Sequence, residues 1–439
     1  MVRTPLSAAI PDLELSETEQ HEIIEQAAAV LAETLQIERE FLSEKVSKHE
    51  WKEVRGRHKN FQVYKERRRS SSRGRASDAS KTSTETKSID LEEVDWDGTR
   101  MNDESLYSDS FANSFVSEGV PLRMMSQLRD NLESTQSSSS QSSGGTSVTP
   151  ASDYSVPMVV GIGQTDGHLE DVVFGAYAGD YSSWQQRAAY TGDKYTDSRI
   201  LSTILGPTPE DPYRFLGIKW FAREQKRAII GNFISDRDFL VIEATGITRD
   251  DDGATHGYYI MQSFRHPLIP ELKERKVLRC DISLCYISRQ ISADKVQVFT
   301  RGFIDPKGSM PASFTIAVSA KPMMVQLEAV EVSYNKKLMW LAEQTQRSNP
   351  LHHQEPMGTR LCDSCQKKFN FMSSNLSTCQ VCRHCVCSKC IIQRKLVVGV
   401  SSSGVTEHVL PFCMGCVQMA KHMPPHQVAL DTVVGRYVR

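Results

Sequence analysis

Residues 277–287 read VLRCDISLCYI, and their character alternates from one position to the next. The apolar positions share one parity and are Leu278, Cys280, Ile282, Leu284 and Tyr286. The positions between them include Arg279, Asp281 and Ser283. Because successive side chains of a strand point to opposite faces, this pattern predicts a strand in a sheet that has one apolar face and one solvated face.

Further strand-like segments lie on both sides of this stretch. They share an alternating character and are 200–205, 213–221, 239–245, 258–264 and 295–304. Two shorter segments before them, 169–179 and 183–190, have helical character. This order of elements favours an antiparallel sheet with helices packed against it.

A long helix is predicted at each end of the sheet. Residues 16–19 read SETE, a capping-box pattern, and apolar residues then recur at helical spacing to about His49. This N-terminal segment is a long amphipathic helix or a coiled coil. Two short strands, 51–54 and 61–64, follow it, and a second long helix is expected after Pro322. The fold class that results is α+β.

The composition changes abruptly at Arg67. Residues 67–72 are basic and rich in serine, 90–97 are acidic, and 134–147 consist almost entirely of Ser, Thr, Gln and Gly. Such a stretch cannot bury enough apolar surface to offset its ordering entropy. We therefore expect residues 67–153 to be a disordered insertion.

Composition excludes several classes of function. The 439 residues carry a formal net charge of −2, which gives no reason to expect nucleic acid. Residues 1–16 lack the apolar core of a secretory signal, and we find no uncharged apolar run of about 18 residues. The 12 histidines show no spacing with Ser or Asp that is typical of a catalytic site. The expectation is a cytoplasmic protein that is not an enzyme and meets membranes only peripherally.

Several of these segments resemble the START lipid-transfer domains. The resemblance rests on WKEV at 51–54, FQVYK at 61–65, SDRDFLV at 235–241, the strands 258–266 and 277–290, and the helix after Pro322, in family order. It covers about 16–66 and 155–345. It implies a helix-grip fold, in which a curved antiparallel sheet holds the C-terminal helix over a tunnel for one lipid.

The implied lipid site also makes physical sense. Burying each methylene group is worth about 0.8 kcal/mol, so an acyl chain or sterol can leave a membrane without covalent chemistry. Candidate lipid-contacting residues are Cys280, Ile282 and Leu284 on the apolar face of the central strand. Glu243 joins them, because it matches the position at which sterol-carrying members of the family place an inward arginine.

Nine of the 11 cysteines lie between residues 362 and 416. Eight of them form four CxxC pairs, Cys362–Cys365, Cys379–Cys382, Cys387–Cys390 and Cys413–Cys416. Eight thiolates are enough for two tetrahedral sites of four cysteines each, and soft thiolates in closed tetrahedra suit Zn²⁺. The sequence therefore predicts two zinc ions per chain.

The spacing of these pairs resembles the FYVE zinc finger, which binds phosphatidylinositol 3-phosphate on endosomes. The resemblance implies a cross-brace, in which the first and third pairs hold one ion and the second and fourth pairs hold the other. Residues 375–378, Asn-Leu-Ser-Thr, stand where the family has its basic run, and Pro411 stands where it has an arginine. The Trp-x-x-Asp motif of the family is also absent from 348–361. These departures predict that the finger does not read the inositide headgroup.

The charge of the finger supports the same expectation. Residues 351–416 hold seven Lys or Arg and three Asp or Glu, giving +4, while eight thiolates with two Zn²⁺ give −4. Little positive charge is left to attract an anionic membrane. Phe371 and Met372 are either a loop tip that dips into a membrane or part of the core of the finger.

An alternative interpretation has His384 in place of Cys379 as a ligand. The ligand spacing is then that of a RING finger of a ubiquitin ligase. This alternative leaves Cys379 and Cys385 without a role, so the four complete pairs are the simpler interpretation. The domains expected along the chain are a tail (1–15), the START-like domain (16–66 and 154–345) with its insertion (67–153), a linker (346–360), the finger (361–420) and a C-terminal tail (421–439).

The function favoured by these patterns is that of a lipid-binding, peripheral membrane protein with a zinc-stabilised FYVE-like module. Its expected partners are a lipid in the START-like cavity and an endosomal or other intracellular membrane. Two alternatives stay open: a RING-type ubiquitin ligase with a lipid-sensing domain, and a zinc-bearing scaffold.

Overall fold

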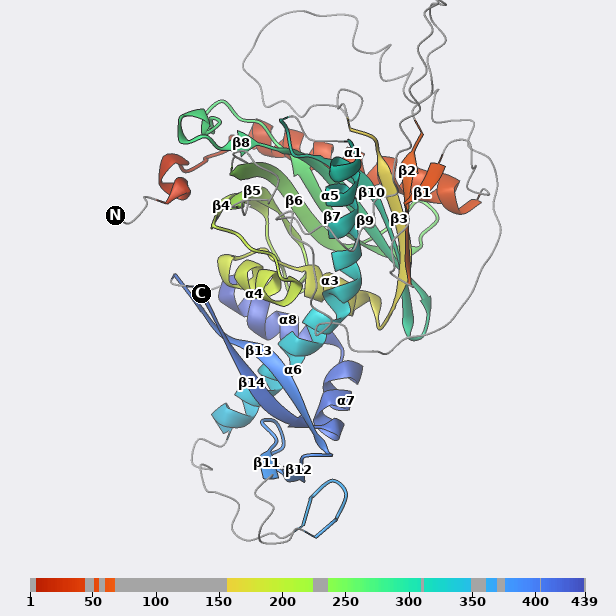
Figure 1. Ribbon diagram of the computed structural model, residues 1–439, viewed down its shortest axis with the longest axis vertical. Coiled ribbons are helices and arrows are strands. Elements are labelled where there is room, and N and C mark those ends of the chain that lie inside the picture. Colours follow the sequence, from red (N-terminus) through yellow and green to blue (C-terminus); the bar gives the residue numbers. More distant parts are fainter. Residues whose placement is uncertain are drawn as a thin grey trace, which may run out of the picture.

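The computed structural model describes residues 5–43, 51–54, 60–67, 156–223, 236–308, 312–348, 361–368, 376–402 and 404–437. The predicted disordered insertion, apart from Arg67, lies outside these residues, as do Phe371 and Met372. The α+β class is confirmed, because one large antiparallel sheet carries helices on both faces (Figure 1). Among the described residues, no helix is long and apolar enough to cross a bilayer.

The sheet has ten strands. They are β1 (Trp51–Val54), β2 (Phe61–Glu66), β3 (Val159–Asp166), β4 (Asp197–Leu205), β5 (Phe215–Arg223), β6 (Arg237–Arg249), β7 (Thr255–Ser263), β8 (Leu278–Arg279), β9 (Asp281–Ser292) and β10 (Lys295–Asp305). Their order across the sheet is β1-β2-β3-β10-β9-β7-β6-β5-β4, and short β8 pairs with β6. All neighbours are antiparallel except β8 and β6.

Two neighbouring strands border the predicted insertion. Strand β2 pairs directly with β3, with Lys65 opposite Val159. The N–H of Glu66 also donates to the carbonyl of Met158 at 3.0 Å. The segment between them therefore leaves and re-enters the sheet at adjacent positions, where an insertion interrupts no strand.

One face of the sheet is covered by α1 (Glu17–Ser43). The predicted capping box is present, since the N–H of Ser16 donates to Glu19 Oε2 at 2.8 Å and the N–H of Glu19 donates to Ser16 Oγ at 3.3 Å. Ile23, Leu35 and Phe41 of α1 are buried against the strands. The prediction of a solvated face is therefore wrong.

The polar residues of that face are buried in ion pairs. Arg279 lies 2.7 Å from Asp238, and Asp281 lies 2.7 Å from Arg265. Both Arg279 and Asp281 are under a tenth exposed. Alternation located β9, but the predicted segment also contains β8, which pairs with β6 instead of continuing β9. Partners from other segments bury the polar side of both.

The opposite face is covered by α3 (Leu169–Ala176), α4 (Tyr181–Thr191), α5 (Ala312–Val325), the 3-10 turn η6 (Gln326–Glu328) and α6 (Ala329–Ser348). The helix expected after Pro322 begins earlier, at Ala312, and Pro322 lies inside α5. The chain then passes through η6 before α6 begins. Backbones meet closely here, because a Cβ on Gly175 of α3 would lie 1.7 Å from the carbonyl oxygen of Ala329.

The cysteine-rich region adds β11 (Leu376–Thr378), β12 (Cys385–Cys387), β13 (Ile391–Ser401), β14 (Gly404–Cys413) and α7 (Met414–His422). The region assigned to a C-terminal tail continues as α8 (Pro425–Ala429), the π-helical turn η7 (Leu430–Val434) and α9 (Gly435–Tyr437). Val428, Ala429 and Val433 are buried in the same core as the sheet. The first residues also pack, because η1 (Leu6–Ala9) precedes buried Ile10 and Leu13.

Candidate functional site

The eight cysteines of the CxxC pairs lie in two groups of four. The first group is Cys362, Cys365, Cys387 and Cys390, and the second group is Cys379, Cys382, Cys413 and Cys416. Within each group the sulfur atoms all lie within 4.8 Å of one another. The first and third pairs thus share one group, and the second and fourth pairs share the other, which is the interleaved arrangement of a cross-brace.

The sulfur spacing fits a tetrahedral ion. Cys365 Sγ lies 3.9 Å from Cys387 Sγ in the first group, and Cys382 Sγ lies 3.7 Å from Cys413 Sγ in the second. A Zn–S bond of about 2.3 Å places tetrahedral ligands about 3.8 Å apart. Both groups can therefore hold a metal ion such as Zn²⁺.

The first two pairs are held by turns of the same geometry. The residue after each pair, Gln366 or Arg383, has a left-handed backbone with φ of 57° or 62°. Its N–H donates to the carbonyl of the first cysteine of its pair, Cys362 or Cys379, at 2.8 and 3.1 Å. Each turn folds the chain back so that both thiols of a pair face the same point.

Backbone donors prepare the sulfur atoms to carry negative charge. The N–H groups of Cys365 and Cys387 both donate to Cys362 Sγ at 3.4 Å. Burial raises the pKa of the Cys362 thiol, but these donors outweigh burial and bring the pKa down to about 6. In the second group, Cys413 caps the N-terminus of α7 and accepts from the N–H of Cys416 at 3.4 Å. Thiolate is the form that binds metal.

His384, the residue that distinguishes the RING alternative, lies outside both groups. The second group contains Cys379 and does not contain His384, whose carbonyl oxygen accepts from the N–H of Cys379 at 2.9 Å. Cys385 is buried, and its N–H donates to Asp363 Oδ2 at 2.7 Å. This contact ties β12 to the first turn and orients the pair that follows it.

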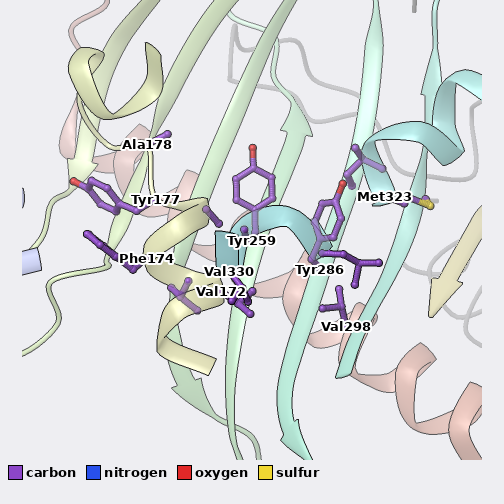
Figure 2. Packing of buried hydrophobic residues seen from close by; sticks show 14 of the residues in the cluster. Val172, Phe174, Tyr177, Ala178, Tyr259, Tyr286, Val298, Met323 and Val330 are labelled. Carbon is purple, nitrogen blue, oxygen red and sulfur yellow. The ribbon is translucent and has the colours of Figure 1, made fainter. Parts of the chain in front are cut away.

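The candidate lipid residues lie on the sheet face that α5 covers. Cys280, Ile282 and Leu284 are each at most 4% exposed and belong to one core. Figure 2 shows Tyr259 and Tyr286 on neighbouring strands of that face, with Met323 of α5 near Tyr286. The Tyr286 hydroxyl donates to the carbonyl of Pro322 at 2.9 Å, which fixes α5 to β9.

Glu243 lies on this same face and is 1% exposed. It stands opposite Met261 on β7, which stands opposite Leu284 on β9, so the three form one row across the sheet. Its Oε1 lies 2.7 Å from Lys219 Nζ on β5 and 3.6 Å from Arg187 Nη1 on α4. We call Glu243, Lys219 and Arg187 the ionic cluster. The row therefore runs from the ionic cluster at Glu243 to the apolar side chain of Leu284 on β9.

Aromatic rings surround the two cations. Lys219 Nζ lies 4.6 Å from the ring centre of Trp184 and 4.7 Å from that of Phe215, and Arg187 lies 5.2 Å from that of Tyr259. Burial lowers the pKa of Lys219 to about 8, although Glu243 opposes the shift. Lys219 also donates to the carbonyl of Ala178 at 2.6 Å, which fixes the chain just after α3 to the sheet.

Glu243 Oε2 is buried and has no hydrogen-bond partner among the described residues. The same holds for Nε1 of Trp184, whose ring centre lies 4.6 Å from Lys219 Nζ. Burying a polar atom without a hydrogen bond costs about 1–3 kcal/mol. Glu243 Oε2 can accept a hydrogen bond, and Trp184 Nε1 can donate one, to a polar group that enters this face of the sheet.

Sequence reasoning found Glu243 but missed Lys219 and Arg187. Lys219 lies in FLGIKWFA, a strand that is otherwise apolar, and a cation within such a run was the available indication. Arg187 lies on a helix of mixed composition and offered no comparable indication.

Comparison with solved structures finds distant likenesses over about half of the chain. The crystal structure of human STARD10 matches with a TM-score of 0.31 and 14% identity, over 54% of this chain and 91% of that one. The human StarD13 lipid transfer and protein localization domain matches with a TM-score of 0.30 and 11% identity, over 48% and 97%. Human StAR-related lipid transfer protein 5 matches with a TM-score of 0.28 and 16% identity, over 48% and 95%. No family model and no curated protein matches the chain.

Proposed function

We propose that this protein binds one amphiphilic lipid between the sheet and the helices α3, α4 and α5. The observation that carries the proposal is Glu243, a buried carboxylate whose Oε1 pairs with Lys219 while its Oε2 has no partner among the described residues. The apolar chain of the lipid packs along the row of side chains that begins at Glu243 and passes through Met261 to Leu284. Its polar end donates a hydrogen bond to Glu243 Oε2, so the headgroup carries a hydroxyl or an amine.

Physical chemistry favours this class of ligand. Apolar burial contributes about 0.8 kcal/mol per methylene group, which is enough to hold a long chain away from water. The row is polar only at Glu243, so it gives the ligand one orientation: only the polar end of the ligand can hydrogen-bond to Glu243. Binding and transfer of such a molecule need no covalent step, so we propose a carrier or sensor rather than an enzyme.

We propose that the two cysteine groups bind structural Zn²⁺. Four thiolates close each site, so no coordination position is left for a substrate. The metal contributes folding energy to a region whose own apolar core is small. We further propose that the protein is cytoplasmic and peripheral to intracellular membranes, and that the finger does not select phosphatidylinositol 3-phosphate.

Extraction of lipid from vesicles tests the lipid site. The intact chain is incubated with vesicles made from a mixed lipid extract, and the recovered protein is analysed for bound lipid. Glu243→Gln should lower the lipid recovered, because it alters the acceptor at the polar end. Glu343→Gln is the matched control, since Glu343 lies on the outside of α6 and is 41% exposed. Equal recovery with both variants would contradict the proposed role of Glu243.

A zinc-bearing scaffold is the second candidate. It is favoured by the close packing of Cys280, Ile282 and Leu284 against neighbouring side chains. In that case the wild-type chain should recover no lipid from any vesicle, while both metal ions stay bound.

A further inference from the structure

Helix α6 belongs to two cores at once. Its first half contributes Val330 and Tyr334 to the core of the large sheet. Its second half contributes Leu338 and Ala342 to the core that contains Cys379, Cys413 and Cys416. The cysteine-rich region therefore packs on α6, which also covers one face of the large sheet.

One buried ammonium group joins three elements at the point where these cores meet. Lys337 Nζ lies 2.7 Å from Asp171 Oδ1 on α3 and 2.8 Å from the carbonyl of Met423, just after α7. Asp171 also accepts from Ser333 Oγ of α6 at 2.5 Å. Lys337 and Asp171 are both fully buried. We call this contact the Lys337 clamp.

Helix α7 connects the Lys337 clamp directly to the second cysteine group. Cys413 is the N-cap of α7, and Cys416 lies in its first turn. The carbonyls of Lys421 and Met423 at the other end face Lys337 at 3.4 and 2.8 Å. Negative thiolates at the N-terminus and a cation at the C-terminus both stabilise α7, because each interacts favourably with the helix dipole.

The chain after α7 covers α3. Val428, Ala429 and Val433 are buried with residues of α3 in the sheet core. Asp431 accepts from Trp340 Nε1 of α6 at 3.1 Å. Helix α3 in turn lies against the sheet, because a Cβ on Gly257 of β7 would lie 2.4 Å from Val173.

The end of α3 leads to the proposed lipid site. Lys336 of α6 donates to the carbonyls of Phe174 and Tyr177 at 2.8 and 3.3 Å. Lys219 of the ionic cluster donates to the carbonyl of Ala178. A displacement of α3 would therefore break contacts around Glu243.

We infer that the second cysteine group regulates access to the lipid face through α7 and the Lys337 clamp. With metal bound, the group fixes α7, and α7 with its C-terminal extension holds α3 against the sheet. When the metal is lost, α3 and residues 425–437 loosen. The sheet face that carries Glu243 and Leu284 then becomes accessible to a lipid. The inference rests on the proposed lipid function for its purpose, but the mechanical coupling can be measured without lipid.

Hydrogen–deuterium exchange of the full chain tests the coupling. Removing metal with a strong chelator should raise exchange in residues 169–178 by about tenfold, while strands β9 and β10 stay protected. Cys416→Ser, in the second group, should have the same effect. Cys365→Ser, in the first group, should leave the exchange of 169–178 within about twofold of wild type.

A double variant separates the clamp from the metal. Lys337→Met with Asp171→Asn removes both charges together, so no buried charge is left unpaired. This variant should retain both metal ions, and chelation should no longer change the exchange of 169–178. Unchanged exchange in the wild-type chain on chelation would overturn the inference, and so would loss of protection across the whole sheet. Lipid recovery is measured on the same samples, and its absence throughout would count against the proposed function alone.

Discussion

Replacing Lys219 with methionine tests the ionic cluster on which the lipid proposal depends. Methionine keeps much of the length of the side chain but removes the ammonium group that pairs with Glu243 at 2.7 Å. Both side chains are at most 1% exposed, so the carboxylate has no access to water when its partner is lost. Removing one member of a buried pair costs about 3–5 kcal/mol. Arg187, 3.6 Å from Glu243, remains as a weaker partner, so we expect about 3 kcal/mol.

The matched double variant, Lys219→Met with Glu243→Gln, removes both charges. It should cost less than Lys219→Met alone, because no buried carboxylate is left without its lysine and Arg187 keeps its hydrogen bond to the carbonyl of Ala176. The coupling energy should be about 2 kcal/mol. Urea unfolding followed by the fluorescence of buried Trp184 and Trp220 measures each free energy of unfolding.

Arg347→Met is the control. Arg347 lies 3.5 Å from Glu343, but the two side chains are 69% and 41% exposed, so the change should stay within about 0.5 kcal/mol. A cost below about 1 kcal/mol for Lys219→Met, or additive effects in the cycle, would refute the description of the cluster as a buried, coupled pair.

Three further predictions follow from other parts of the structure. Cys379→Ala should lose one bound metal ion and His384→Ala should lose none, and native mass spectrometry counts them; metal loss on changing only His384 would favour the RING arrangement. Deleting residues 70–150 should leave the thermal transition of the sheet nearly unchanged. The deletion only shortens the connection between the paired strands β2 and β3, and loop-closure entropy varies slowly with length. Loss of the cooperative transition in calorimetry would contradict this. Burial, with Arg187 nearby, lowers the pKa of Lys336 from 10.5 to about 7. Between these two pH values the unfolded state binds more protons than the folded state. The contribution of Lys336 to the free energy of unfolding should therefore rise with pH from about 7 to 10.5. Urea unfolding of wild type and Lys336→Met across that range checks the sign. A wild-type free energy of unfolding that falls relative to that of the variant as pH rises would show that the sign is wrong.

Local patterns predicted the elements that depend on local chemistry. The SETE box begins α1 because its two reciprocal hydrogen bonds lie within four residues. The alternation of 277–287 places Cys280, Ile282 and Leu284 on one face, because the strand period fixes side-chain direction. The interleaved cysteine groups came from a family resemblance rather than from spacing alone.

Other features depended on contacts between distant segments. Arg279 and Asp281 are polar and were expected to be solvated, but partners elsewhere in the chain bury them. Pro322 lies inside α5, where the Tyr286 hydroxyl bonds to its carbonyl oxygen. Residues 421–439 were expected to be a tail, but Val428, Ala429 and Val433 are buried. Their burial follows from contacts with α3 and α6, which no local pattern in that segment reveals.

Native mass spectrometry of the intact chain, expressed in a cytosol and purified without detergent, tests the central claim most directly. It reports the metal count and the mass of any bound lipid in the same spectrum. The account predicts two zinc ions and one lipid per chain, with the lipid reduced in Glu243→Gln and retained in Glu343→Gln. A chain that carries two zinc ions but no lipid, before and after incubation with mixed vesicles, would contradict the lipid-binding function and favour the scaffold.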